Sequence, residues 1–301
     1  MIDDNRTVSV IMNCFNGYKY LRQAIESVIS QSYQDWELIF WDNQSTDNSA
    51  DIAQSFLDHR VRYFYAPRHT LLSEARSEAV QKAQGQFIAF LDVDDWWETE
   101  KLSQQIPYFI NPEIGLVCSN YISVYQRNGK RKLALKSIPP TGSCLNDILK
   151  NYYIGLPTLI LRRSAYDSLN YGFDTKYHLI GDFDLCARLL CKWKLEYVDK
   201  PLAFYRRHDE MGSVTLSSKN VEELSHWCDR MKLVTKITSN PGFSVLRNNV
   251  IYMDALDHIM KGDRIGSLRF INNLCLGIRK LKAIVALFLP IQILAALRGL
   301  K

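Results

Sequence analysis

The fold of this chain is decided by residues 8–41, VSVIMNCFNGYKYLRQAIESVISQSYQDWELIFW, in which two apolar runs enclose an amphipathic stretch. Val8–Phe15 is a nearly continuous apolar run, as expected of a strand that is buried on both faces. Tyr18–Ser32 places apolar residues at helical spacing, and Trp36–Trp41 predicts a second strand. A strand, a helix and a second strand in this order predict a βαβ unit with parallel strands.

The same alternation continues beyond this first unit. The sequence predicts a helix over Asp47–Leu57 with Asp47 as its cap, a strand over Val61–Tyr65, a helix over Ser73–Ala83 with Gly85 as its C-cap, and a strand over Gln86–Leu91. We therefore predict an α/β fold, with a mostly parallel sheet flanked by helices. Such sheets bind ligands at the carboxyl ends of their strands, so the polar residues after each strand form the candidate site.

The pattern is less regular in the middle of the chain and becomes helical at its end. Short strands are predicted at Leu116–Tyr125, Lys130–Ile138, Thr158–Leu161 and Leu195–Val198, and a helix is predicted at Asp182–Trp193. From about Ser218 the sequence predicts helices as far as Lys301. These features indicate a sheet domain followed by a helical extension.

The net charge is concentrated at the C-terminal end. The 301 residues include 37 Lys and Arg against 32 Asp and Glu, a formal net charge of +5, and 47% of them are hydrophobic. This composition is typical of globular proteins and excludes a disordered or collagen-like chain. Residues 241–301 contain nine basic and three acidic residues, and no acidic residue follows Asp263. The rest of the chain is close to neutral, which argues against nucleic acid as a partner.

The cysteines and the start of the sequence indicate a cytoplasmic location. No CxxC pair occurs, so neither a zinc ribbon nor a redox motif is predicted. The scattered cysteines, several of them in apolar runs as buried thiols are, are Cys14, Cys118, Cys144, Cys186, Cys191, Cys228 and Cys275. Met1–Arg6 lacks the basic and apolar regions of a signal peptide, so we expect a reducing compartment.

Three carboxylates follow the fourth predicted strand, in Asp92-Val93-Asp94-Asp95. Carboxylates so close together repel one another, and a cation would offset that repulsion. Their oxygens are hard ligands that suit Mg²⁺ or Mn²⁺, ions that commonly bridge to substrate phosphates. The alternative is a solvated acidic turn that caps the next helix.

Polar residues also follow the first two predicted strands. Asp42 and Asn43 come directly after the second strand. Capping of the next helix explains the polar residues that follow them, but it does not explain Asp42. The first strand ends in Asn13-Cys14-Phe15-Asn16-Gly17, a turn that is either an ordinary connection or a surface for a base or ribose. The common placement of the three turns at one sheet edge indicates a single site.

The segments VSVIMNCFNGYKYLRQAIESVISQSYQDWELIFWDNQSTDNS, SEARSEAVQKAQGQFIAFLDVDDWW and GDFDLCARLLCKWKLEYVDKPLAFYRRH resemble, in order and spacing, the family-2 glycosyltransferases of bacterial surface-glycan synthesis. The resemblance extends from Thr7 to His208. It implies a GT-A fold, a nucleoside-diphosphate-sugar donor with UDP as the expected nucleotide, Mn²⁺ or Mg²⁺ as cofactor, and inversion at the anomeric carbon.

The resemblance also implies roles for individual residues. The donor-binding residues would be Asn13, Phe15, Asn16, Asp42, Asn43, Arg76 and Asp92. Arg76 alone could equally be a surface ion-pair residue. Two positions depart from the family pattern, because many members have proline at the place of Asn13 and a second aspartate at the place of Asn43.

The implied metal ligands are Asp92, Asp94 and His208, and Asp182 is the implied catalytic base. Gly181 replaces the glutamate that precedes this aspartate in the family, which removes one acidic neighbour. The alternative role of Asp182 is the N-cap of the predicted helix.

We therefore predict a GT-A catalytic domain over residues 1–215, with a nucleotide-sugar half over about 1–110 and an acceptor half over 111–215, and a helical extension over 216–301. The predicted activity is transfer of a hexosyl or N-acetylhexosaminyl group to a hydroxyl of a glycan or lipid-linked saccharide. The alternatives are a nucleotide-sugar-binding protein without transfer activity, and a nucleotidyltransferase or Rossmann dehydrogenase. The last two are disfavoured because both GxGxxG after the first strand and a P-loop are missing.

The C-terminal segment predicts where the enzyme acts. Ala283–Leu297 contains no charge, and basic residues flank it on both sides. As a helix it would span ~22 Å, short of the ~30 Å hydrocarbon core, and Pro290 would kink it. We expect peripheral membrane contact through residues 279–301 at the cytoplasmic face of the inner membrane. A helix packed on the protein, or in a homodimer interface, is the alternative.

Overall fold

The computed structural model describes residues 7–208 and 218–297. It divides into two compact units, of which unit 1 comprises Met1–Cys144 and Tyr152–Met211, and unit 2 comprises Leu145–Asn151 and Gly212–Lys301. The predicted boundary at residues 215 and 216 lies outside the described residues. The short segment Leu145–Asn151, which the sequence analysis placed in the catalytic domain, belongs with the helical unit.

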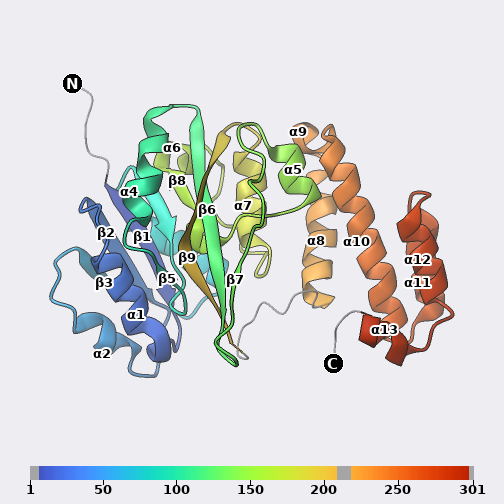
Figure 1. Cartoon of the computed structure of the whole chain (residues 1–301), viewed down its shortest axis with the longest axis horizontal. Coiled ribbons are helices and arrows are strands. Elements are labelled where there is room, and N and C mark those ends of the chain that lie inside the picture. Colours follow the sequence, from blue (N-terminus) through green and yellow to red (C-terminus); the bar gives the residue numbers. More distant parts are fainter. Residues whose placement is uncertain (1–6, 209–217, 298–301) are drawn as a thin grey trace. The chain divides into compact units, whose positions relative to one another are not determined.

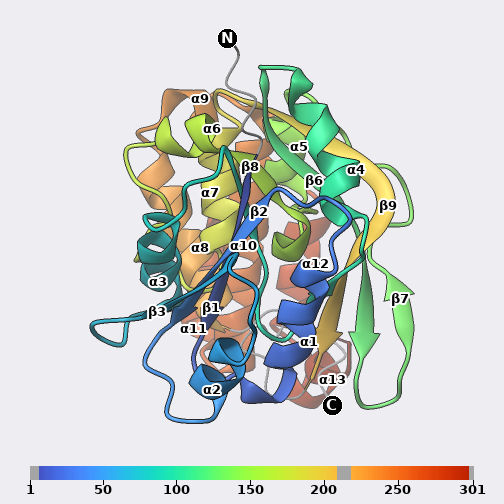
Figure 2. The same ribbon diagram turned by 90° about the vertical axis from the view of Figure 1, so that its left-hand side faces the viewer.

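The first half of unit 1 contains four parallel strands, as predicted. They are β1 (Val8–Cys14), β2 (Trp36–Asp42), β3 (Val61–Tyr65) and β4 (Phe87–Phe90). Both neighbours of β1 run parallel to it, with Val8 opposite Trp36 on one side and opposite Phe87 on the other. Every residue of β1, β2 and β4 is buried, which explains their continuous apolar runs. Figures 1 and 2 show these strands side by side.

The helices of this half are shorter than predicted. They are α1 (Tyr18–Ile29), α2 (Ser49–Gln54) and α3 (Leu72–Val80). Asp47 is not the N-cap of α2, since Asn48 holds that position. The prediction for Gly85 is also wrong, because α3 ends at a Gln81 cap. A Cβ on Gly85 would lie 2.5 Å from the Thr7 carbonyl oxygen, so close backbone approach to β1 selects glycine there.

The second half of unit 1 makes the sheet mixed. It adds β5 (Trp96–Trp97), β6 (Ile114–Tyr125), β7 (Arg131–Leu133), β8 (Ile160–Arg162) and β9 (Lys194–Arg207), in the order β3-β2-β1-β4-β8-β6-β9-β5 with β7 paired to β6. Strand β8 is antiparallel to β4 and β6, and β5 is antiparallel to β9, whereas β6 and β9 are parallel. The prediction of a mostly parallel sheet is therefore correct for β1 to β4 and for the pair of β6 and β9.

Strand β9 is much longer than the predicted Leu195–Val198. It continues through Pro201, which pairs with Asn120 where the register between β6 and β9 shifts. Proline lacks the N–H that a regular ladder needs, so it is tolerated at such an irregularity. The extension carries β9 past the end of β4 and brings its last residues to the turn that follows β4.

Four short helices and α7, which reaches the candidate site, complete the described part of unit 1. They are α4 (Lys101–Gln105), the 3-10 helices η1 (Ile106–Ile110) and η2 (Leu156–Thr158), α6 (Arg163–Asp167) and α7 (Gly181–Leu189). Helix α7 buries Phe183, Leu185 and Leu189, which fixes the orientation of its first turn.

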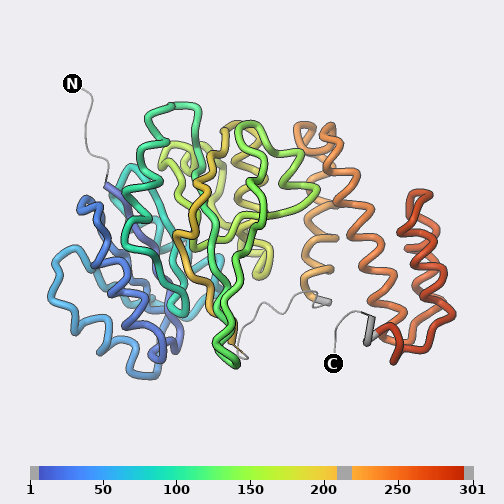
Figure 3. The backbone as a smooth tube through the Cα atoms, viewed as in Figure 1, coloured from blue at the N-terminus to red at the C-terminus, as the bar shows by residue number. Residues whose placement is uncertain are grey.

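Unit 2 is helical, as predicted. Its helices are α5 (Leu145–Lys150), α8 (Ser218–Met231), α9 (Thr235–Thr238), α10 (Pro241–Met260), α11 (Arg264–Asn273), α12 (Ile278–Ala286) and α13 (Ile291–Leu297). The long helix α10 is the centre of this unit, since α5, α8, α11 and α12 all pack against it, as the backbone trace in Figure 3 shows for the last two.

The apolar segment that the sequence analysis singled out forms two helices rather than one. Pro290 lies between α12 and α13, and the Arg264 guanidinium donates to the carbonyl oxygens of Leu287 at 2.7 Å and Leu289 at 2.9 Å. These bonds satisfy carbonyl groups that the helix break leaves free. Among the described residues, we find no helix with both the length and the apolar character needed to cross a bilayer.

Candidate active site

The turns after β1 and β2 are joined by hydrogen bonds. Asn16, in the left-handed region with a φ of 54°, accepts the Thr46 backbone N–H through Oδ1 at 2.8 Å, and its own N–H donates to Ser45 Oγ at 3.0 Å. Asp47 accepts the Tyr18 backbone N–H at 3.2 Å and so supports the first turn of α1. Asn16 thus orders the two turns as one surface.

Asp42 and Asn43 are buried inside this surface. Asp42 accepts from the Ser45 backbone N–H and from the Tyr63 hydroxyl, each at 2.7 Å. Asn43 donates to the Thr70 carbonyl oxygen at 2.7 Å and accepts the Thr70 backbone N–H at 3.1 Å. Only an amide can both donate and accept in this way, which explains asparagine where the family has aspartate. Both side chains shape the turns that a donor would meet.

Asn13 and Phe15 differ in exposure at this edge. Asn13 is buried, and its buried Nδ2 has no hydrogen-bond partner among the described residues. Phe15 is 51% exposed, and its ring lies 4.2 Å from the His69 ring between centroids. His69 is oriented by Nδ1, which lies 2.8 Å from the Asn43 carbonyl oxygen. The exposed aromatic pair could bind a planar base, whereas the Asn13 amide lies below the surface.

The turn after β4 distributes its three carboxylates over three different contacts. Asp92 Oδ1 accepts from Arg76 Nη2 at 2.7 Å, and this arginine is 7% exposed. Asp94 Oδ2 lies 2.9 Å from His208 Nε2 at the end of β9. Asp95 is buried and accepts the Arg206 backbone N–H at 2.8 Å, so it ties the turn to β9. Arg76 is thus an internal ion-pair partner, and neither Asp92 nor Asp94 is a free surface carboxylate.

The electrostatics of Asp94 are those of a crowded acidic site. Burial raises the pKa of Asp94 above its ordinary value, and the charge of Asp92 raises it further. An oxygen from Asp94 and a nitrogen from His208 form a donor pair that suits Mn²⁺, and a cation would relieve the repulsion between the carboxylates. Within residues 7–208 and 218–297, no cluster of three or more His, Cys, Asp and Glu is arranged to hold a metal. Asp94 and His208 therefore do not form a complete metal site by themselves in the described residues.

The two arginines at the end of β9 have different environments. The Arg206 guanidinium lies 4.2 Å from the Tyr20 ring centroid and 4.5 Å from that of Trp96, and its Nε donates to the Asp94 carbonyl oxygen at 2.7 Å. Arg207 lies over the Tyr205 ring, and its Nε has no hydrogen-bond partner in the described part of the chain. Arg206 therefore braces the turn, whereas the Nε of Arg207 is buried without a hydrogen-bond partner in the described chain.

Asp182 lies in the first turn of α7 rather than at its N-cap, which is Ile180. Burial raises the pKa of Asp182, while the Phe183 backbone N–H, the charge of Arg76 and the Tyr152 hydroxyl lower it. Tyr152 donates to Asp182 Oδ2 at 3.1 Å. A partly buried carboxylate with a raised pKa and an orienting hydroxyl is suited to accept a proton.

Arg76 links this carboxylate to the turn after β4. Its guanidinium binds Asp92 and its charge acts on Asp182. Gly181 has a local reason as well, because a Cβ there would lie 3.0 Å from Ser73 Oγ. The predicted residues of the carboxylate turn, β9 and α7 are therefore brought to one place.

Sequence reasoning did not find Tyr152, His69 or the bracing role of Arg206. Tyr152 lies in an irregular segment, 30 residues before Asp182, and no periodic pattern marks it. His69 is in the connection between β3 and α3, so only its position directly after a Pro-Arg pair indicated a loop.

The sequence model described as glycosyl transferase family 2 matches residues 9–169, which is more than half of the chain. The chain belongs to this family. A relative from Escherichia coli, the UDP-Glc:alpha-D-GlcNAc-diphosphoundecaprenol beta-1,3-glucosyltransferase WfgD, is 32% identical over 170 residues, or 56% of this chain. The chain spans 66% of the length of that relative, slightly less than two thirds.

Solved structures show the same fold at low sequence identity. TarS 1-349 of S. aureus in complex with UDP-GlcNAc has a TM-score of 0.60 and 17% identity, with 87% of this chain and 89% of that chain covered. The mannosyltransferase PcManGT of Pyrobaculum calidifontis, in complex with GDP-Man and Mn²⁺, has a TM-score of 0.57 and 12% identity, with 97% and 84% covered. These likenesses confirm the predicted glycosyltransferase fold.

Proposed function

We propose that this family member is an inverting glycosyltransferase that moves a hexosyl or N-acetylhexosaminyl group from a UDP-sugar to a saccharide hydroxyl. The observation that carries the proposal is the assembly of Asp92, Arg76 and Asp182 in unit 1. A donor's diphosphate needs positive charge and a metal, and an acceptor's hydroxyl needs a base. In this proposal Arg76 supplies positive charge near the diphosphate and Asp182 is the base.

Asp182 is the proposed base. An acceptor hydroxyl that attacks the anomeric carbon loses its proton, and a carboxylate within hydrogen-bond reach takes it. The raised pKa of Asp182 makes it a better proton acceptor than an exposed aspartate, and the Tyr152 hydroxyl fixes the orientation of the carboxylate. Attack from the face opposite the leaving diphosphate gives inversion.

The donor would lie along the turns after β1, β2 and β4. Phe15 with His69 offers aromatic surface to the base, and the buried Asn13 lies in the turn that carries Phe15. Asn16, Asp42 and Asn43 support these turns through internal hydrogen bonds. Uridine is proposed as the base because WfgD is named for a UDP-sugar and TarS was solved with one.

Asp94 and His208 are the proposed ligands for Mn²⁺ or Mg²⁺, with Asp92 contacting the donor side of the same turn. A divalent ion bound there supplies Lewis-acid neutralisation of the charge that develops on the leaving diphosphate. Asp95 and Arg206 hold the turn in place.

The proposed acceptor is a lipid-linked saccharide of surface-glycan synthesis, because WfgD is named for a diphosphoundecaprenol-linked acceptor. Such an acceptor places the reaction at a membrane surface. We assign the peripheral contact to residues 279–301, of which 298–301 lie outside the described residues, and the location to the cytoplasmic face of the inner membrane.

A panel of nucleotide-sugars tests the proposal. Purified protein is incubated with each donor and Mn²⁺, and release of nucleoside diphosphate is measured with and without a GlcNAc-diphospho-lipid. We expect UDP release that the acceptor stimulates, and a loss of about 10²–10⁴-fold in turnover for Asp182→Asn with donor binding retained. Donor binding without turnover would instead indicate a nucleotide-sugar-binding protein, and full activity of Asp182→Asn would exclude this base.

A further inference from the structure

Helix α12 exposes its larger apolar side chains and buries its smaller ones. Ala283 and Ala286 are buried against the rest of unit 2. The residues on the opposite side, with their exposed fractions, are Ile278 (73%), Leu281 (63%), Val285 (49%) and Phe288 (79%). The first three lie in α12 and Phe288 lies in the turn after it. These four residues, which we name the outer face of α12, recur at the spacing of one helical side. An exposed apolar side of this kind requires an apolar surrounding.

Unpaired basic residues border the outer face. Arg279 and Lys282 are exposed, and neither forms an ion pair with any residue that the structure describes. Lys280, by contrast, donates to the carbonyl oxygens of Asn272 at 3.3 Å and Leu274 at 3.2 Å, so it holds the turn before α12. No acidic residue follows Asp263 in the sequence. The charge beside the outer face is therefore positive and unopposed.

These two cations line a cavity of about 650 Å³ within unit 2. Asn248 and Tyr252 of α10 form one wall, residues 275–278 form the next, and Arg279 and Lys282 of α12 form the third. The lining offers two cations, an amide and a hydroxyl, with no carboxylate. We name it the basic cavity. Leu276, which is 93% exposed, and Ile278 place apolar side chains on the same lining.

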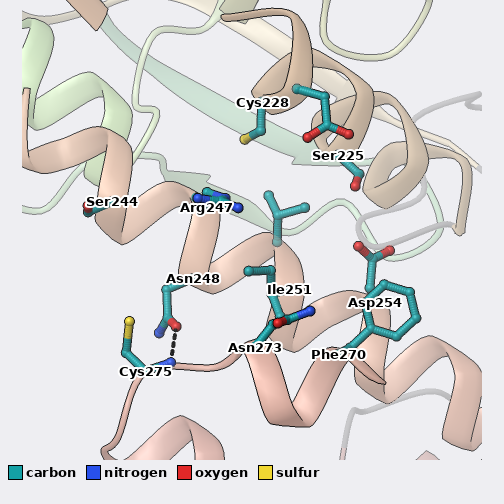
Figure 4. A pocket seen from close by; sticks show the side chains of 12 residues that line it. Ser225, Cys228, Ser244, Arg247, Asn248, Ile251, Asp254, Phe270, Asn273 and Cys275 are labelled. Carbon is teal, nitrogen blue, oxygen red and sulfur yellow. Dashed lines mark hydrogen bonds between the residues drawn. The ribbon is translucent and has the colours of Figure 1, made fainter. Parts of the chain in front are cut away.

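A second cavity of about 420 Å³ lies beside the basic cavity and has a different charge pattern (Figure 4). The two share Asn248 and Cys275, whose backbone N–H donates to Asn248 Oδ1 at 3.0 Å. In the second cavity Arg247 is accompanied by Asp229 and Asp254, so its charge is mixed. Only the basic cavity has the charge pattern that selects an anion.

We propose that the basic cavity binds the phosphate of an anionic phospholipid while the outer face of α12 enters the acyl boundary of the bilayer. A bilayer presents phosphate directly beside hydrocarbon, which matches two cations placed directly beside Leu276 and Ile278. A nucleic acid or a soluble nucleotide presents phosphate without hydrocarbon. The inference rests on the proposed membrane contact and sharpens it, because the contact begins at Leu276 rather than at residue 279 and requires a lipid phosphate.

Vesicle flotation of the full chain tests this binding, with vesicles of phosphatidylcholine alone and of phosphatidylcholine mixed with phosphatidylglycerol. The double variant Arg279→Ala/Lys282→Ala is expected to bind the anionic vesicles about 30-fold more weakly, since each cation near an anionic surface contributes about fivefold. Its binding to the neutral vesicles is expected to stay unchanged. Phe288→Asp is expected to lose binding to both kinds of vesicle.

The matched control is Lys232→Ala/Lys261→Ala, which removes the same charge from unit 2. These lysines pair with Asp229 and Asp257, so their loss is expected to change anionic-vesicle binding by less than about twofold. Equal losses in the two double variants would overturn the proposal, because they would show a delocalised effect of charge. Inorganic phosphate should compete with the binding of the wild type to anionic vesicles. If phosphate binds the wild type without weakening its binding to these vesicles, the proposal is overturned as well.

UDP release from a UDP-sugar without vesicles separates this inference from the proposed function. Both double variants are expected to retain it, because no residue of the basic cavity belongs to the catalytic unit. Wild-type UDP release together with no preference for anionic vesicles would refute the lipid-phosphate site and leave the glycosyltransferase function standing. Circular dichroism of every variant verifies that the helices of unit 2 are intact.

Discussion

Replacing Tyr152 by phenylalanine removes the hydroxyl that bonds the proposed base and that also contacts Cys186 Sγ at 3.7 Å. The Tyr152 hydroxyl donates to Asp182 Oδ2 at 3.1 Å, and its ring meets the Phe183 ring edge-on with 5.5 Å between centroids. Phenylalanine keeps that ring contact and removes only the hydroxyl. The change therefore acts on the ionised form of Asp182, which accepts the bond, with little effect on packing.

The magnitude follows from the kind of bond that is lost. A hydrogen bond to a charged group contributes about 1.5–3 kcal/mol, and this one favours the carboxylate over the carboxylic acid. Without it the pKa of Asp182, already raised by burial, rises further. The base works only when ionised, so activity is lost as the pH falls through that pKa. Tyr152→Phe should move this loss to higher pH and reduce kcat about tenfold to hundredfold on the acidic side of the profile.

The assay is UDP release from the best UDP-sugar of the panel, with kcat and KM measured over a range of pH. We expect KM for the donor to change little, because Tyr152 contacts the base and not the donor turns. Tyr153→Phe is the matched control, since it removes the hydroxyl of the neighbouring residue, which donates to the Pro140 carbonyl oxygen. An acidic limb that stays in place in Tyr152→Phe, or that moves equally in the control, would refute the positioning role.

Three further predictions concern the metal turn, a buried cation and the donor loop. Asp94→Asn should abolish the Mn²⁺-dependent part of UDP binding, and unchanged binding in calorimetry with and without Mn²⁺ would contradict its ligand role. Lys101→Met should raise the free energy of unfolding by about 1–3 kcal/mol, because Lys101 is fully buried and Nζ has no hydrogen-bond partner in the described chain. Burial lowers the pKa of Lys101, so the wild type loses stability as the pH falls below the unfolded-state pKa. The increase in the free energy of unfolding of Lys101→Met over the wild type, measured by urea denaturation, should therefore be larger at neutral than at alkaline pH. Asn43→Asp should cost about 1–3 kcal/mol, since it sets a carboxylate against the Thr70 carbonyl oxygen, and thermal unfolding equal to wild type would disprove this loop role.

The elements that sequence reasoning predicted well are those with strong periodic signals. The ranges of β1, β2 and β3 agree with the predicted strands within a residue at each end, because full burial leaves an uninterrupted apolar run. The antiparallel strand β8 and the long β9 were not predicted in direction or length. Direction depends on where a strand returns to the sheet, and no local pattern records that.

Candidate residues could be predicted from the sequence where a motif follows a strand, but the contacts of these residues could not be predicted. Asp92 and Asp94 could be identified from the acidic turn alone, yet the sequence could not show that one binds Arg76 and the other faces His208. Asp42 is a buried support with both oxygens occupied by protein donors. A side chain's role depends on its neighbours in space, and those neighbours come from distant parts of the chain.

Local patterns in the sequence were enough to predict an α/β chain with an acidic turn at the end of a strand. They also showed that the charge is close to neutral before residue 241 and that the C-terminal segment is basic and apolar. Alternation of apolar runs and the placement of charge carry that information locally. The packing of the folded chain adds that Tyr152 orients Asp182, that Arg76 binds Asp92 while its charge acts on Asp182, and that α12 buries alanines while exposing isoleucine and leucine. Periodicity specifies that a helix has two sides, whereas the packing of the whole unit determines which side meets solvent.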